Sequence, residues 1–160
     1  MKKLIIIPIC FILFHAELNA QDYQIPGAVP YFSAVIVSNI EISSSWYQSL
    51  FGLRIKNKMY DSAGTYKIMI LESGKILLEL LELKGSLEKK KLLENMPEGT
   101  QIRGHFKFGF SITNVDAWLK RCADLHIAVD RVYVDSPSGL RNFLINDPDG
   151  NLIQFFELKE

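Results

Sequence analysis

The sequence is poor in cysteine. It contains two cysteines, of which Cys10 lies inside an apolar N-terminal run and Cys122 lies on a predicted helix. If the N-terminal run is removed from the mature protein, one thiol is left, and one thiol cannot form an internal disulfide. A disulfide framework is therefore excluded, and Cys122 is predicted to be buried and unreactive.

Net charge is also absent. The chain has 18 Lys and Arg residues against 18 Asp and Glu residues. Removing the first twenty residues takes away two lysines and one glutamate, so the remainder stays essentially neutral. A neutral chain has no electrostatic footprint for nucleic acid or for anionic lipid. Nucleic acid is therefore not an expected partner.

No apolar run is long enough to cross a bilayer. The longest, Leu4 to Phe14, has about eleven residues, whereas a membrane-spanning helix needs about 20. Two lysines precede this run and the small residue Ala20 follows it, a pattern typical of a cleaved signal peptide rather than of a helix packed in the core. We therefore predict a signal peptide over residues 1–20, cleavage between Ala20 and Gln21, and an exported, periplasmic or secreted protein without stable membrane insertion.

What the sequence does contain is an internal repeat. When the chain is shifted by 75 residues, apolar and polar classes agree between its two halves without a gap. The matching segments are Ala34–Glu41 with Gly109–Asp116, Leu77–Glu79 with Leu152–Gln154, and Glu82 with Glu157. Because several segments match at one offset, chance is a poor explanation, and a duplicated structural unit is predicted.

Each half predicts a strand, a helix and three further strands. The predicted strands cover about 31–38, 53–60, 64–72 and 75–83 in the first half and about 105–113, 127–134, 139–146 and 151–158 in the second. Ser38-Asn39 and Thr113-Asn114 have side chains suited to capping the starts of the two helices, and Gly52 is suited to end the first. The segment Asp147–Gly150 predicts a tight turn between the last two strands.

The predicted domain organisation follows from this pattern. Residues 21–30 form an irregular lead-in, and 31–160 form a single α+β domain made of module 1 (31–83), a linker (84–103) and module 2 (104–158). The linker contains a short Lys/Glu/Leu segment that predicts one surface helix. Its lysine run, Lys89 to Lys91, is balanced by Glu88 and Glu94, so a solvated face is favoured over a binding patch.

Two segments carry a resemblance to a known family. Trp46–Leu53 resembles the first-helix signature, and Phe143–Phe156 the closing hairpin, of the vicinal oxygen chelate superfamily, which includes glyoxalase I, bleomycin-resistance and extradiol dioxygenase proteins. The resemblance covers about residues 31–158. It implies two βαβββ modules that each curl a four-stranded mixed sheet around a shared cavity in which ligands bind.

The resemblance also identifies the positions of metal ligands. Metalloenzymes of the superfamily use four residues, which correspond here to Phe32, Glu79, Lys107 and Gln154. Only Glu79 is a ligand of the expected type, because phenylalanine has no donor atom and a protonated lysine repels a cation. We therefore expect no metal or other cofactor. A divalent metal at a displaced site formed by Glu79 and His105 is the alternative.

Strand alternation predicts the lining of the cavity. Lys107, Gly109 and Ser111 share one face of their strand, and the opposite face should pack its phenylalanines against a helix. Tyr66 and Arg141, one offset apart, are predicted to reach inward. The candidate ligand-binding residues are Phe32, Tyr66, Glu79, Lys107, Ser111, Arg141 and Gln154.

Two functions remain open at this point. The first is a binding protein for a small carboxylate or aromatic molecule, with Lys107 as charge partner and Gln154 as hydrogen-bond donor. The second is a glyoxalase-like lyase or isomerase, with Glu79 as general base and either an atypical metal or Lys107 as electrophile. A Ser111–Lys107 nucleophile is excluded, since four residues of strand separate them by about 13 Å. The modules could pair within one chain or by exchange in a homodimer, and an ion pair between Lys107 and Glu79 could neutralise both.

Overall fold

The computed structural model describes residues 30–158, and Tyr31–Glu160 belongs to one compact unit. The first module contains β1 (Ser33–Ile36), α1 (Ile40–Phe51), β2 (Arg54–Tyr60), β3 (Tyr66–Ser73) and β4 (Ile76–Leu83). After the linker helix α2 (Lys89–Leu93), the second contains β5 (Lys107–Ile112), α3 (Val115–Asp124), β6 (Val129–Val134), β7 (Arg141–Asn146) and β8 (Leu152–Glu157). The predicted signal peptide, and the lead-in up to residue 29, lie outside the described residues.

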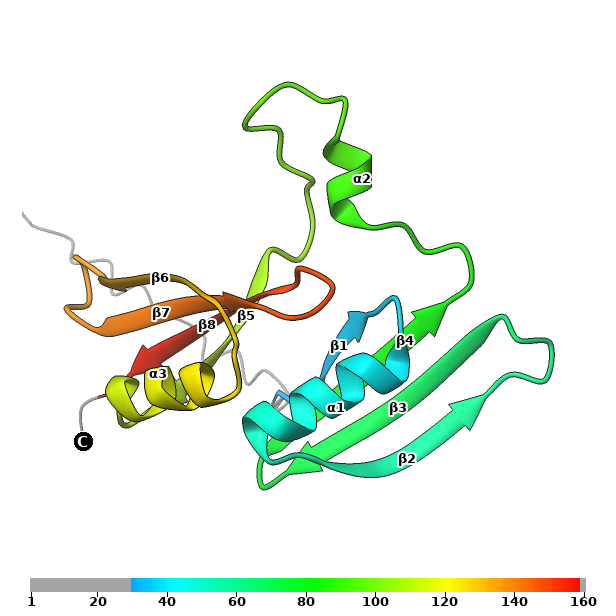
Figure 1. Cartoon of the computed structure of the whole chain (residues 1–160), viewed down its shortest axis with the longest axis horizontal. Helices are drawn as coiled ribbons and strands as arrows, with labels where there is room; N and C mark the ends of the chain where they lie inside the picture. The colour runs from blue at the N-terminus through cyan, green and yellow to red at the C-terminus, as the bar shows by residue number, and fades with distance from the viewer. Residues whose placement is uncertain (1–29, 159–160) are drawn as a thin grey trace, which may run out of the picture. The chain divides into compact units, whose positions relative to one another are not determined.

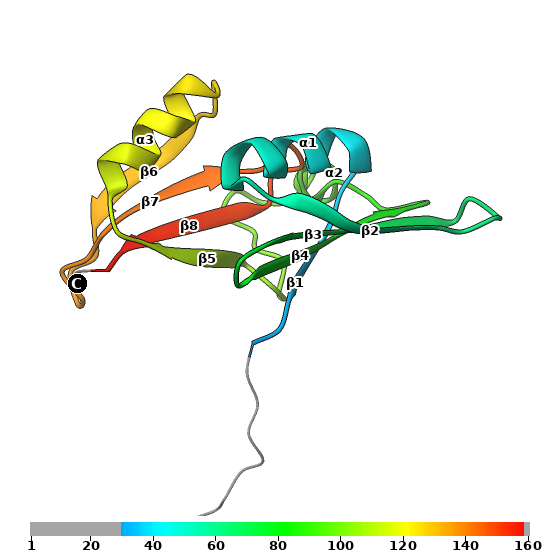
Figure 2. The same cartoon turned by 90° about the horizontal axis from the view of Figure 1, so that it is seen from below.

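The two modules repeat one topology, as the α+β prediction requires. Strand order is β1-β4-β3-β2 in one four-stranded sheet and β5-β8-β7-β6 in the other. In each sheet the first and last strands of the module pair in parallel and the other neighbours are antiparallel. Figures 1 and 2 show α1 lying on the sheet of module 1 and α3 on that of module 2. The predicted βαβββ repeat is therefore confirmed.

Both main helices begin at the predicted asparagines. The side chain of Asn39 accepts hydrogen bonds from the backbone N–H groups of Glu41 and Ile42, at 3.1 Å each. Asn114 accepts one from Ala117 at 2.9 Å. These bonds satisfy N–H groups that a helix start leaves without a partner. The first helix ends at a glycine in the left-handed conformation, also as predicted.

A glutamate from the last strand of each module completes the helix start. Glu82 accepts from the N–H of Ile40 at 2.8 Å, and Glu157 accepts from the N–H of Val115 at 2.9 Å. The two bonds are related by the 75-residue offset seen in the sequence. A carboxylate at a helix start is favourable because it faces the positive end of the helix dipole. The matching glutamates of the repeat therefore do the same structural work in both modules.

The offset does not hold for every strand. Ile70 pairs with Glu79, nine positions later, whereas Leu144 pairs with Gln154, ten positions later. The second hairpin therefore contains one residue more than the first, and the gap-free alignment predicted from the sequence is wrong for β7. A shift of one residue exchanges the two faces of a strand. Arg141 consequently does not occupy the position equivalent to Tyr66.

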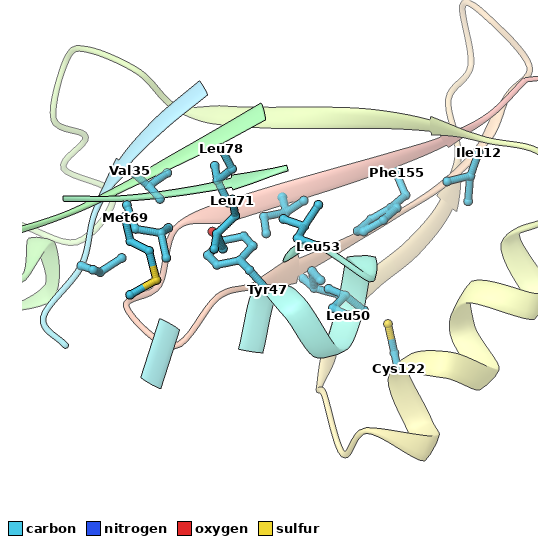
Figure 3. Packing of buried hydrophobic residues seen from close by; sticks show 14 of the residues in the cluster. Val35, Tyr47, Leu50, Leu53, Met69, Leu71, Leu78, Ile112, Cys122 and Phe155 are labelled. Atoms are coloured by element: carbon cyan, nitrogen blue, oxygen red, sulfur yellow. The ribbon is translucent and has the colours of Figure 1, made fainter. Parts of the chain in front are cut away.

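The core fills the space between helices and sheets (Figure 3). In module 1, Tyr47 and Leu50 from α1 meet Met69 and Leu71 from β3, and all four are fully buried. Burying a side chain of this size stabilises a fold by about 1.5–3 kcal/mol. Cys122 is fully buried in the same cluster, as predicted, and burial raises the pKa of its thiol.

Aromatic side chains connect the two modules. Phe155 in β8 stacks on Phe143 with ring centroids 4.4 Å apart and on Phe51, from α1 of the other module, at 5.7 Å. Phe108 and Phe110 pack against this cluster, as alternation along β5 predicts. Phe106 differs from the prediction because it lies before β5 and is 59% exposed. Within the described part of the chain, no helix is long and apolar enough to cross a membrane.

Candidate ligand site

The face of the module 2 sheet turned away from the core carries the predicted residues of β5 and β8. Lys107 pairs with Leu152, Gly109 with Gln154, and Ser111 with Phe156. Paired residues project to the same side of a sheet, and the alternate phenylalanines of β5 pack in the core. The prediction that Lys107, Gly109 and Ser111 share one face with Gln154 is therefore confirmed. We call this side of the two sheets the cavity face.

Gly109 keeps the cavity face open beside Gln154. A Cβ atom at Gly109 would lie 3.1 Å from the backbone oxygen of Gln154 and 3.6 Å from the ring of Phe156. The first of these distances is too short for an ordinary contact, so a side chain would displace the neighbouring strand. Glycine at this position therefore lets β5 pair with β8 without moving the backbone at Gln154.

Module 1 presents a different cavity face. Glu79 in β4 pairs with Ala34 in β1 and with Ile70 in β3, so its carboxylate lies among apolar side chains. Tyr66, at the start of β3, lines a groove of about 880 Å³. Phe32 precedes β1 and is 54% exposed. Of the residues predicted in this module, Glu79 is thus the one on a strand interior.

Gln154 is held rigidly by its neighbours. Its side-chain nitrogen Nε2 donates to the hydroxyl of Tyr133 and to Oδ1 of Asn142, at 2.6 Å each. The amide of Asn142 is oriented in turn, because its Nδ2 donates to the backbone oxygen of Leu140 at 2.8 Å. If the nitrogen and oxygen of either side-chain amide were exchanged, two hydrogen-bond acceptors or two donors of Gln154 and Asn142 would face each other. The orientation of Gln154 therefore follows from a backbone carbonyl.

This network leaves the side-chain oxygen of Gln154, Oε1, without a hydrogen bond from the described residues. Both N–H bonds of the amide are used internally, and Oε1 is buried with no hydrogen-bond partner among the described residues. Gln154 itself is 2% exposed. An unpaired buried carbonyl costs free energy, on the order of 1–3 kcal/mol. The sequence predicted Gln154 as a donor to a ligand, whereas its free atom is an acceptor.

Lys107 and Glu79 are not paired with each other. Neither takes part in an ion pair among residues 30–158, so the predicted neutralising contact is not formed. The ammonium of Lys107 lies 5.8 Å from the centre of the Phe106 ring. Lys107 therefore has an aromatic neighbour and no carboxylate to neutralise it.

Arg141 lies on the helix side of the module 2 sheet. Its guanidinium donates to both carboxylate oxygens of Asp116, in the first turn of α3, at 3.1 and 2.8 Å. Glu157 lies 3.8 Å away. The hydrogen bonds from Arg141 hold the pKa of the Asp116 carboxyl below its usual value. The predicted inward reach of Arg141 is thus corrected by the one-residue shift of β7.

The structure adds a contact between the modules that the sequence did not reveal. The turn between β7 and β8 docks onto the start of α1: Asp149 accepts hydrogen bonds from the N–H of Ser38 at 2.8 Å and from the hydroxyl of Ser43 at 3.0 Å. Asp147 accepts from the hydroxyl of Tyr47 at 2.8 Å. Burial first, and then the Asp147 carboxylate, raises the pKa of Tyr47 well above its usual range. The two segments that carried the family resemblance therefore bind each other.

A second feature missed by the sequence is a pocket at the start of β5. It has a volume of about 230 Å³ and is lined by Lys107, by His105 and by Lys89 of the linker. The 880 Å³ groove lined by Tyr66 shares Lys89 and His105 with it, so the two cavities adjoin each other. The charges along the linker sequence did not predict this pocket, because only the folded chain brings Lys89 near the start of β5.

The four metal-ligand positions of the family do not form a metal centre here. Phe32 offers no donor atom and Lys107 offers a cation, which leaves the carboxylate of Glu79 and the free oxygen of Gln154. Among the described residues there is no group of three or more His, Cys, Asp and Glu side chains placed to hold a metal ion. The donor set does not fit a four-ligand metal.

Comparison with known proteins agrees with this architecture. The uncharacterised protein YaeR from Escherichia coli (strain K12) is 22% identical over 125 residues, which cover 78% of this chain and 92% of that protein. Among solved structures, a glyoxalase family protein from Enterococcus faecalis has a TM-score of 0.71 at 16% identity, covering 81% of this chain and 97% of that one. The fosfomycin resistance protein FosX from Listeria monocytogenes has a TM-score of 0.63 at 16% identity, covering 85% and 96%.

Lactoylglutathione lyase from Agrobacterium tumefaciens has the same fold, with a TM-score of 0.56 at 20% identity over 82% of this chain and 94% of that one. These likenesses concern the fold alone. The family profile extends over residues 29–155, which is most of the chain. The chain is a member of the glyoxalase/bleomycin resistance protein/dioxygenase superfamily.

Proposed function

We propose that this protein binds a small anionic molecule on its cavity face and does so without the metal centre of its metalloenzyme relatives. One observation carries the proposal: Lys107 occupies a metal-ligand position, and no carboxylate among the described residues neutralises it. The positive charge of the Lys107 ammonium thus takes the place of the positive charge of a metal ion. Such a site attracts the carboxylate or other oxyanion that a metal would attract.

The cavity face of module 1 supports a ligand that is partly apolar. Ile36, Ile70 and Leu81 on the cavity face of module 1 provide an apolar wall. A mostly apolar surface with a few fixed polar groups is typical of small-molecule sites.

The alternative is an enzyme that uses Glu79 as general base. Glu79 is half-buried among apolar neighbours and takes part in no ion pair within the described residues, so its carboxylate is free to accept a proton. Lactoylglutathione lyase and FosX share the fold and are an enzyme and a resistance protein by name. The reaction would be a lyase or isomerase step on a carbonyl or carboxylate compound, with Lys107 as electrophile.

Native protein analysis separates the two functions. We expect mass spectrometry of the purified native protein to detect a bound small molecule, and elemental analysis to find well under one equivalent of zinc, nickel, manganese or iron. Stoichiometric metal that is lost in Glu79→Ala would contradict the binding-protein proposal and support the enzyme. The Arg141→Ala variant is a matched control, because that side chain lies on the helix face.

We also propose that the protein is exported and that it forms a homodimer. The charged start, short apolar run and Ala20 support export, and N-terminal sequencing of the protein from cell envelopes should begin at Gln21 rather than Met1. The cavity face leaves Ile36, Met59 and Tyr66 exposed, which a second copy would cover. Light scattering of the purified protein should therefore give twice the mass of the chain.

A further inference from the structure

The pocket at the start of β5 gathers positive charge. Lys89 comes from α2, and His105 and Lys107 come from the chain as it enters β5. None of the residues that line this pocket is an aspartate or a glutamate. The structure therefore brings Lys89 of the linker together with His105 and Lys107 in one pocket, and among the described residues that line it there is no carboxylate.

The two lysines share one aromatic neighbour. The ammonium groups of Lys89 and Lys107 are each 5.8 Å from the centre of the Phe106 ring. An ammonium at this distance is attracted to the ring, which helps to hold both groups beside it. Phe106 is largely exposed, although large apolar side chains usually avoid water. The ring is thus a common neighbour of both ammonium groups and also offers an apolar surface to a ligand.

The acidic residues nearest to this pocket are engaged elsewhere or face another cavity. Asp149 accepts hydrogen bonds from Ser38 and Ser43, and it lines the larger groove and, with Lys89 and Glu94, a neighbouring hollow. Glu88 lines the larger groove. Within residues 30–158, Lys89 forms no ion pair with any of these carboxylates.

Neutral polar groups complete the lining. Asn146, Gly150 and Asn151 line the same pocket. The side-chain nitrogen of Asn151 already donates to Asp147 at 2.8 Å, so the amide of Asn146 is the one that can donate to a ligand. Amide N–H groups donate to oxyanions and, unlike carboxylates, do not repel them. Two ammonium groups with neutral donors around them suit a doubly charged oxyanion better than a single carboxylate, because a second charge is attracted by the second lysine.

We infer that this pocket binds the doubly charged oxyanion of a small molecule, a phosphate monoester or a phosphonate, whose apolar part lies against Phe106. This inference rests on the proposed function and adds Lys89 and His105 to Lys107 as parts of one anion site. The volume of about 230 Å³ is below the range of about 300–1,000 Å³ that whole small ligands occupy. The pocket therefore takes the charged group, and the remainder of the ligand extends into the adjoining groove.

Calorimetric titration with phenylphosphonate at pH 8, where this probe is doubly charged, tests the inference. We expect it to bind more tightly than benzoate, which has one charge, and more tightly than inorganic phosphate, which has no ring. Lys89→Met and Lys107→Met should each weaken binding by about ten- to a hundredfold, the loss expected for a charge-assisted hydrogen bond. Lys75→Met is the matched control, because Lys75 is exposed on the β3–β4 turn and its substitution removes the same charge.

The variants separate this inference from the proposed function. If Lys107→Met weakens the binding of phenylphosphonate and Lys89→Met does not, the two-lysine site is wrong and the proposed function stands. If neither phenylphosphonate nor benzoate binds, both are wrong. An equal loss in Lys75→Met would show a general charge effect and overturn the two-lysine site. Lys89→Arg, which keeps the charge, should retain binding, and equal melting temperatures of all variants confirm that each is folded.

Discussion

Modules 1 and 2 share one fold but present different surfaces to the cavity. In module 1, the carboxylate of Glu79 lies among apolar side chains and has no ion-pair partner among the described residues. In module 2, the equivalent Gln154 is fully buried and held by Asn142 and Tyr133. The repeat thus preserves the residues that build the helices and sheets. The residues on the cavity face differ, because apolar side chains surround Glu79 in module 1 and hydrogen-bonded polar side chains hold Gln154 in module 2.

Substitutions in the core should have the largest effects on stability. Phe155 in module 2 and Leu80 in module 1 are equivalent and fully buried, but Phe155 also stacks on Phe143 and on Phe51 of the other module. We expect Phe155→Ala to lower the free energy of unfolding by about 3–5 kcal/mol and Leu80→Ala by about 2–5 kcal/mol. Urea denaturation measures both. A smaller loss in Phe155→Ala than in Leu80→Ala would contradict the role of Phe155 between the modules.

The link between the modules provides the next test. Tyr47→Phe removes the hydrogen bond to Asp147, and a bond to a buried carboxylate contributes about 1.5–3 kcal/mol. Folding raises the pKa of Tyr47, so this contribution is complete below about pH 10, the ordinary tyrosine value, and declines above it. Denaturation of both proteins at pH 8 and pH 11 should therefore show a gap that narrows at high pH. A constant gap would contradict the assignment.

The two equivalent polar positions should respond differently to substitution. Gln154→Glu removes both N–H donors and sets a carboxylate beside Oδ1 of Asn142, so we expect a loss of about 1–3 kcal/mol in unfolding free energy. Glu79→Gln breaks no contact made by a described residue and should change stability by less than about 0.5 kcal/mol. Thermal denaturation of both variants checks this. Equal losses would mean that Gln154 is not locked as described.

Arg141 should give the smallest effect on binding. Its guanidinium is engaged by Asp116 on the helix face, away from Lys107. Arg141→Met is therefore expected to leave the affinity for phenylphosphonate unchanged, which calorimetry measures. A clear loss of affinity would show that Arg141 reaches the cavity face, as the gap-free alignment of the two halves predicted.

Much of the fold could be predicted from the sequence because its signals are local. Alternating apolar residues gave the strands and the shared face of Lys107 and Gln154, and Asn39 and Asn114 marked the helix starts. The extra residue in the β7–β8 hairpin could not be seen, since it changes the side of Arg141 without changing the apolar pattern enough to reveal a gap.

The parts of the site that were missed depend on contacts between distant segments. The approach of Lys89 to Phe106 brings together residues near the two ends of the linker, and no local pattern encodes this. The orientation of Gln154 depends on Asn142, twelve residues earlier, and on a backbone carbonyl beside it. Spacing can place a side chain on a face of a strand, but it cannot say which of its atoms is already bonded.

The most direct test of the central claim is a double-mutant cycle of Lys107→Met and Glu79→Gln, read in both stability and ligand affinity. Phenylphosphonate serves as the probe. If Lys107 is the charge partner of the ligand, Lys107→Met lowers affinity about ten- to a hundredfold with stability unchanged, and Glu79→Gln does not restore it. Unaltered affinity in Lys107→Met, together with a loss of stability that Glu79→Gln restores, would contradict the account.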